Sequence, residues 1–176
     1  IRPPNVNLSD PPNGTYNRTS THNFTSNASD NIALFNSTLY HNIQGSWVAN
    51  QTVTRNGTTN SSGFTVANIV NGTYIWNVQW CDEAGNCNQS RSNFSFTVDT
   101  IRPPNVNLSD PPNNTLNNTN RHNFTSNASD DIALFNATLY HNISGSWVAN
   151  QTVTRNGTTN SSGFIVGNIA DGGYTW

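Results

Sequence analysis

The chain has 176 residues, enough for one large domain or two ordinary ones, and only 9% of them are charged. None is lysine or methionine, and the formal net charge of −2 is not gathered in blocks, which argues against binding to nucleic acid or to an anionic membrane. No apolar stretch approaches the roughly 20 residues of a membrane-spanning helix, so we expect no membrane span in this segment.

Short alternating segments predict β-strands from the start of the chain. In the first, Val6 and Leu8 alternate with polar residues between two Pro-Pro pairs. The second strand is predicted at 22–30, where the sequence HNFTSNASD places every second side chain on the same face. Its predicted core face consists of Phe24, Ser26 and Ala28. Its predicted outer face includes Asn23 and Asn27.

Five more strands are predicted up to residue 98. The third lies at 34–42, and we expect its core face to hold Phe35, Ser37 and Leu39. The next two lie at 46–54 and 63–69. The sixth, at 73–81, has an aromatic-rich core face of Tyr74, Trp76, Val78 and Trp80. The last, at 93–98, turns inward Phe94, Phe96 and Val98. About seven short strands without a helical period predict an all-β fold, a β-sandwich.

The chain repeats itself with a period of 100 residues. Residues 1–76 align without gaps with residues 101–176, and 62 of these 76 positions are identical. One period has the common size of a domain. We therefore expect a complete domain at 1–100 and a second copy at 101–176 that is truncated before its last strands. We expect the 176 residues to be a window on a longer array; if Trp176 is a true end, a neighbouring chain has to donate a strand.

Several motifs resemble those of bacterial and archaeal immunoglobulin-like (Ig-like) surface domains. They are the Asp-Thr-x-x-Pro opening at 99–103, the Ala-Ser-Asp-Asn turn at 28–31, the Gly-x-Tyr at 72–74 and the Asp-x-Ala-Gly-Asn hairpin at 82–86. The resemblance covers the whole first repeat and all that is present of the second. It implies tandem Ig-like β-sandwiches of the kind used as stalks, spacers and adhesion units.

Asparagine is the residue in excess, and most of it stands in Asn-x-Ser/Thr triplets (sequons), the acceptors of N-linked glycans. Ser and Thr make up 40 of the 176 residues, so random placement of the 33 asparagines would give about eight sequons, whereas the chain has 22. The predicted sites in the first repeat are Asn7, Asn13, Asn17, Asn23, Asn27, Asn36, Asn50, Asn56, Asn60, Asn71, Asn88 and Asn93. Those in the second are Asn107, Asn113, Asn117, Asn123, Asn127, Asn136, Asn142, Asn150, Asn156 and Asn160.

The two repeats keep the outer residues of a sequon where the middle one differs. Asn13-Gly14-Thr15 corresponds to Asn113-Asn114-Thr115, and Asn36-Ser37-Thr38 corresponds to Asn136-Ala137-Thr138. We therefore predict a densely N-glycosylated chain in which sugar hydroxyls replace charge as the source of solubility.

Cys81 and Cys87 flank the predicted hairpin turn and are the only cysteines. We expect them to form a disulfide across the hairpin, which would indicate an oxidising, extracellular location. The alternative is a Zn²⁺ site, but two cysteines supply only half of one.

The sequence gives weaker signals for metal binding and for catalysis. The four histidines, His22, His41, His122 and His141, have no ligand partners at metal spacing, so we expect structural histidines. We expect no catalytic residues and no enzyme, because no nucleophile elbow or phosphate loop is present. A Ca²⁺ site at the domain junction, using Asp10, Asp99 and Asp110, stays an open alternative to ordinary turn acids. Pro103 and Pro104 are expected to stiffen this junction.

Together these features predict an extracellular structural protein, a repeat array that forms a glycosylated cell-surface fibre, stalk or coat. Its expected partners are further copies of the repeat and neighbouring chains in a filament. The sequons together with the prokaryotic resemblance suggest an archaeal source. The alternative is an adhesin or glycan-binding module, for which the candidate exposed aromatics are Tyr16, Tyr40 and Trp47.

Overall fold

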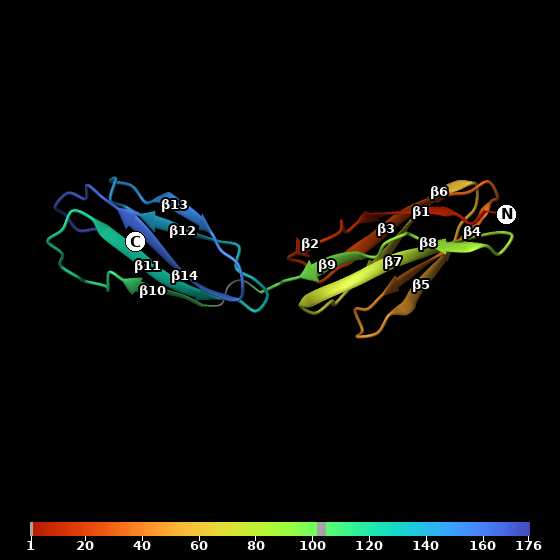
Figure 1. The fold of residues 1–176 in the computed structure, drawn as a ribbon, viewed down its shortest axis with the longest axis horizontal. Coiled ribbons are helices and arrows are strands. Elements are labelled where there is room, and N and C mark those ends of the chain that lie inside the picture. Colours follow the sequence, from red (N-terminus) through yellow and green to blue (C-terminus); the bar gives the residue numbers. More distant parts are fainter. Residues whose placement is uncertain (1, 102–104) are drawn as a thin grey trace. The chain divides into compact units, whose positions relative to one another are not determined.

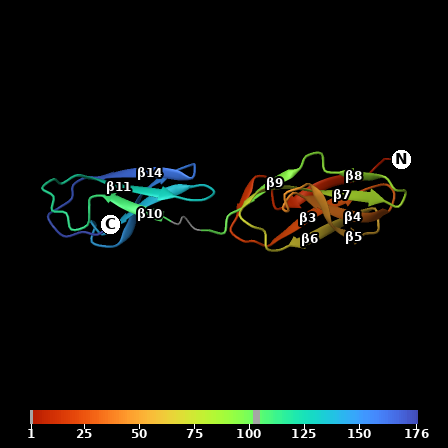
Figure 2. The same cartoon turned by 90° about the horizontal axis from the view of Figure 1, so that it is seen from below.

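The structure, a computed structural model, describes residues 2–101 and 105–176. These residues form fourteen β-strands and no helix (Figure 1). The chain folds as two compact units, Ile1–Thr100 and Ile101–Trp176 (Figure 2). The predicted Pro103-Pro104 junction lies outside the described residues.

The first unit is a sandwich of two sheets. One sheet has the order β1-β3-β6, and the other has the order β2-β9-β7-β4-β5, with β8 paired to β7. All pairs are antiparallel except β2 and β9. The strands are β1 (Asn5–Asp10), β2 (Thr15–Asn17), β3 (His22–Ser29), β4 (Leu34–His41), β5 (Val48–Thr54), β6 (Thr59–Val66), β7 (Gly72–Asp82), β8 (Cys87–Gln89) and β9 (Phe94–Val98).

An aromatic cluster fills the core between the two sheets. The Phe24 ring of β3 meets Trp76 of β7 and Phe96 of β9 edge-on, each at a centroid distance of 5.2 Å. Trp80 lies in the same core and is fully buried. Burying each such side chain contributes about 1.5–3 kcal/mol, so these rings supply much of the stability of the unit.

The predicted faces of β3 are confirmed. Phe24, Ser26 and Ala28 are buried, and Asn23 and Asn27 are exposed. The alternation holds because β3 is the middle strand of its sheet, with one face on the core and the other in solvent.

The predicted face of β4 was wrong at Phe35, which is 52% exposed, whereas Leu34 is fully buried. The register against β7 shifts between Leu34, which pairs with Asp82, and Asn36, which pairs with Cys81. Phe35 is the extra residue of a β-bulge, and a bulge re-aims the side chains on either side of it. Ser37 and Leu39 are buried as predicted.

Two strands of the first unit were not predicted, so it has nine strands and not about seven. They are β2 and β8, of three residues each. Such short strands leave no alternation to read. They form because a longer neighbour offers hydrogen-bonding groups, β9 to β2 and β7 to β8.

The second unit has five strands among its described residues. They are β10 (Asn105–Asp110), β11 (His122–Ser129), β12 (Asn136–His141), β13 (Val148–Thr154) and β14 (Thr159–Val166). They form two sheets, β10-β11-β14 and β12-β13, which keep the registers of their counterparts in the first unit.

The second unit has a smaller core than the first. Phe124, Leu139 and Phe164 form it, and Trp176 packs edge-on against Phe124 at 5.3 Å, as Trp76 packs against Phe24. An open groove of about 320 Å³ remains between its two sheets. Val106 on its rim is 65% exposed, compared with 6% for Val6. Among residues 105–176, no strand takes the place that β7 and β9 occupy in the first unit.

Candidate glycan-bearing surface

All 22 sequon asparagines lie outside the buried core. Sixteen are exposed and six are partly buried, and no sequon asparagine is buried. The six partly buried ones are Asn17, Asn36, Asn60, Asn71, Asn142 and Asn160. The one fully buried asparagine among the described residues, Asn77, is not in a sequon. Most sequon asparagines therefore lie where an attached glycan would have room.

Asn23 and Asn27 stand on the outer face of β3, about 13 Å apart along the strand at ~3.3 Å per residue. A Cβ added to Gly63 of β6 would lie 3.0 Å from the Oδ1 of Asn23, and the same distance recurs between Gly163 and Asn123. Glycine at this position leaves room for the asparagine side chain in both units.

An N-linked glycan is attached to the side-chain amide nitrogen Nδ2 of asparagine. At some sequons this nitrogen donates a hydrogen bond to the protein backbone. The Nδ2 of Asn60 donates to the backbone carbonyl of Asn56 at 3.0 Å, and Asn160 repeats this contact at 3.2 Å. The Nδ2 of Asn88 donates to the carbonyl of Pro4 at 3.0 Å. A glycosylated amide keeps one N–H, so these bonds constrain the direction of a glycan without excluding it.

Asn17 differs from the other sequon asparagines, because its Nδ2 is buried and has no hydrogen-bond partner among the described residues. Asn17 ends β2, which pairs in parallel with β9 and places Asn17 opposite Val98. A glycan on this nitrogen has no path to solvent while β2 stays paired.

Other sequon asparagines use the oxygen Oδ1 instead, which a glycan leaves in place. The Oδ1 of Asn13 accepts hydrogen bonds from the backbone N–H and the hydroxyl of Ser95, at 2.8 and 3.1 Å. The Oδ1 of Asn93 accepts from the Nδ2 of the buried Asn77 at 2.8 Å. Such side chains are held in one orientation by the fold and are compatible with modification.

The predicted disulfide between Cys81 and Cys87 is confirmed, and these residues pair directly across β7 and β8. Beside it, Asp82 accepts hydrogen bonds from the side-chain Nδ2 of Asn86 at 2.9 Å and from the Asn86 backbone N–H at 2.8 Å. The Asn86 amide and the turn's backbone N–H groups hold the pKa of Asp82 below its usual value. The hairpin is thus closed by a covalent bond and by a hydrogen-bonded carboxylate.

The predicted histidines occupy two structural positions in each unit. His41 and His141 are buried, and the His41 ring lies 6.4 Å from that of Phe24. Burial lowers the pKa of His41, and its Nε2 is buried without a hydrogen-bond partner among the described residues. His22 packs its ring edge-on against Phe96 at 5.5 Å.

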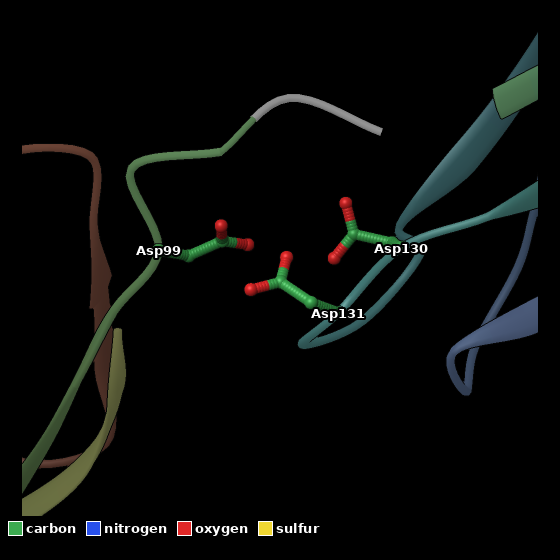
Figure 3. Close-up of side chains that lie close together, drawn as sticks. All are labelled: Asp99, Asp130 and Asp131. Carbon is green, nitrogen blue, oxygen red and sulfur yellow. The ribbon is translucent and has the colours of Figure 1, made fainter. Parts of the chain in front are cut away.

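The acidic residues near the predicted junction belong to two different units. Asp10 and Asp110 end the equivalent strands β1 and β10, and Asp99 follows β9. Figure 3 shows the side chains of Asp99, Asp130 and Asp131. Within the second unit, the Asp130 carboxylate accepts hydrogen bonds from the backbone N–H groups of Ile132 and Ala133, as expected of a turn acid. Binding of Ca²⁺ at Asp10, Asp99 and Asp110 stays a prediction.

Of the three candidate aromatics, Tyr40 and Trp47 form a pair. Their rings stack at a centroid distance of 6.1 Å and an interplanar angle of 23°, and Trp47 is 39% exposed. Tyr140 and Trp147 repeat the pair at 6.2 Å and 19°. Tyr16 is exposed by itself, and the second repeat has Leu116 in its place. Sequence reasoning named these residues but had no signal for the stacking.

No helix in the described part of the chain is long and apolar enough to cross a membrane. No protein-family model matches the chain, and no curated protein matches it significantly. Among solved structures, the chain is similar to the fibronectin(III)-like modules of Clostridium thermocellum CbhA, with a TM-score of 0.52 and 15% identity over 90% of this chain and 77% of that one. At this identity the likeness shows the fold alone: the chain is an all-β protein of Ig-like β-sandwich architecture.

Proposed function

We propose that the chain is part of an extracellular structural protein, a repeat array that forms a glycosylated cell-surface fibre, stalk or coat. The observation that carries this proposal is the distribution of the sequons. The chain has 22 of them, and none of their asparagines is buried. The fold supplies repeated rigid sandwiches, and the glycans supply the surface.

Sheet edges are where such a coat matters most. An edge strand exposes unpaired N–H and C=O groups and invites pairing with another chain. Five described strands of the first unit, β1, β6, β2, β5 and β8, have an unpaired edge, and each contains a sequon asparagine. These residues are Asn7, Asn60, Asn17, Asn50 and Asn88. At Asn7 and Asn50 the side chain is exposed, so a glycan there would block edge-to-edge pairing.

Two features support an extracellular location. The Cys81–Cys87 disulfide persists in oxidising compartments, and the sequons can be used only if the chain is translocated. With the resemblance to prokaryotic Ig-like surface domains, an archaeal cell surface is the setting that we propose.

A second candidate function, an adhesin that binds glycans, is favoured by the exposed Tyr40–Trp47 stack. A sandwich face with exposed aromatic residues and no glycans would favour the adhesin. Glycans on every face would favour the structural scaffold.

The coat function is tested by producing the chain in an N-glycosylating host and in a bacterial cytoplasm. We expect the glycosylated chain to stay monodisperse in light scattering and to resist proteolysis, and enzymatic removal of its glycans to abolish both properties. Equal solubility and protease resistance with and without glycans would contradict the proposal. Retention of either form on immobilised glycans would favour the adhesin.

A further inference from the structure

The stacked pair of Tyr40 and Trp47 lies on the outer face of the sheet that contains β4 and β5, and Tyr140 and Trp147 repeat the pair in the second unit. Tyr40 pairs with Ala49 of β5, close to the turn that joins β4 to β5, and Trp47 stacks on it across that turn. A cross-strand aromatic contact stabilises such a hairpin, which accounts for the stacking. It does not account for the exposed side of the indole, which is 39% exposed at Trp47 and 57% exposed at Trp147.

A sequon stands on the same face of the same strand. Residues two and four positions apart on a strand share a face, so Asn36, Thr38 and Tyr40 project together from β4. The register supports this, because the hydroxyls of the paired residues Thr38 and Thr52 lie 2.9 Å apart. Asn36 is therefore about 13 Å from Tyr40 along the strand, a distance that a short oligosaccharide spans.

The surface between Asn36 and the stack has the chemistry of a sugar-binding face. Tyr40 donates a hydrogen bond to Oε1 of Gln79 at 3.4 Å, and Gln79 pairs with Thr38 across β4 and β7. Hydroxyls and an amide thus border the aromatic rings. A pyranose ring has the complementary pattern, with an apolar C–H face that packs on an aromatic ring and hydroxyls that hydrogen-bond at its edge.

The Asn36 side chain is not engaged elsewhere. It makes no side-chain hydrogen bond with the described residues, in contrast to Asn60 and Asn88. Its counterpart Asn136 is exposed, and the segments that carry the pair differ there only at Ala137 and Ser144.

We propose that the N-glycan of Asn36 folds back along β4 and packs a sugar ring on the Tyr40–Trp47 stack, and that the glycan of Asn136 does the same on Tyr140 and Trp147. This inference rests on the proposed function, since it requires a glycan at these sites. It assigns the exposed aromatics to the chain's own coat, so that the glycan covers the sheet and leaves no open adhesive face.

The test uses the full chain from an N-glycosylating host with ¹³C-labelled sugars, after peptide mapping has measured occupancy at Asn36 and Asn136. We expect NMR to show sugar ring protons of the Asn36 glycan shifted upfield by the indole ring current. The Trp47→Ala variant should abolish this shift and leave the shifts of the Asn136 glycan unchanged. The matched Trp147→Ala variant should do the reverse.

An occupied Asn36 whose sugar signals match those of the free glycan would overturn the inference and leave the glycosylated coat intact. An empty Asn36 in a chain whose exposed sequons are filled would also overturn the inference and leave the coat intact. If glycans released from this protein and added to the fully glycosylated chain shift the Trp47 indole signal, the stack is open to ligands in trans, which also contradicts packing of the attached glycan. General absence of glycans would refute the proposed function itself.

Discussion

The indole Nε1 of Trp80 donates a hydrogen bond of 3.0 Å to the hydroxyl of Ser26, which joins the two sheets of the first unit across the core. Both side chains are essentially inaccessible to solvent. Nearby, the hydroxyls of Ser37 and Ser62 lie 2.5 Å apart and also connect the two sheets. These polar groups are satisfied by one another, so the core tolerates them.

Replacing Ser26 with alanine should destabilise the first unit by about 1–3 kcal/mol, because the buried indole N–H loses its acceptor. The measurement is hydrogen exchange of β3 and β7 backbone amides in the full chain. Ser126→Ala is the matched control, since the Ser126 hydroxyl has no indole partner in the described part of the second unit. An equal effect of both substitutions would show that loss of the hydroxyl itself, and not of this bond, is responsible.

Removal of the disulfide should weaken the first unit alone. For so short a loop the chain-entropy relation gives about 2 kcal/mol. A Cys81→Ser, Cys87→Ser variant is expected to lower the urea midpoint of the first unit and to leave that of the second unit, which has no cysteine, unchanged. Unchanged midpoints for both units would contradict a stabilising role.

The first unit should lose stability in mild acid because of His41. Burial lowers the pKa of His41 below 6.5 in the folded state, so the unfolded chain binds the proton more readily. The contribution of neutral His41 to the free energy of unfolding is therefore constant above pH 6.5. It falls as the pH drops below 6.5 and is fully lost below the pKa of His41 in the folded state. Urea titrations between pH 8 and pH 4 measure the fall, and a His41→Phe variant should flatten it. Parallel curves for the two proteins would count against this account.

The strand faces that the sequence predicted correctly are those with unbroken alternation. In β3, Phe24, Ser26 and Ala28 are all buried as predicted, and in β7 every second residue from Tyr74 to Trp80 is buried. Phe35 was misplaced because a bulge adds one residue, and a bulge depends on pairing with β7 and not on local sequence. The strands β2 and β8 were missed for a related reason, since they exist only as partners of longer strands.

For the candidate surface, the sequence gives every sequon but does not show which asparagine side chains are accessible. The triplets of Asn17 and Asn23 are equally good sequons. They differ because Asn17 ends a strand that packs its amide inward, whereas Asn23 faces the open side above Gly63. This difference lies in tertiary packing, which no triplet encodes.

Asn17 and Asn117 provide a matched test of this difference. The Nδ2 of Asn17 is buried, whereas Asn117 is exposed and its Nδ2 contacts the ring of His122 at 3.0 Å. We expect a higher glycan occupancy at Asn117 than at Asn17 if modification follows folding. Quantitative glycopeptide analysis gives the two values from one sample, and equal occupancy would indicate that the chain is modified before β2 pairs with β9.

The most direct test of the account is site-by-site glycopeptide mapping of the full chain from an N-glycosylating host. A peptide N-glycosidase in ¹⁸O-water hydrolyses the side-chain amide that carries the glycan and so converts each occupied asparagine to a labelled aspartate. The account predicts label at most of the 16 exposed sequon asparagines, Asn23 and Asn27 included, and little at Asn17. Label at only a few scattered sites, or none, would contradict a glycan coat.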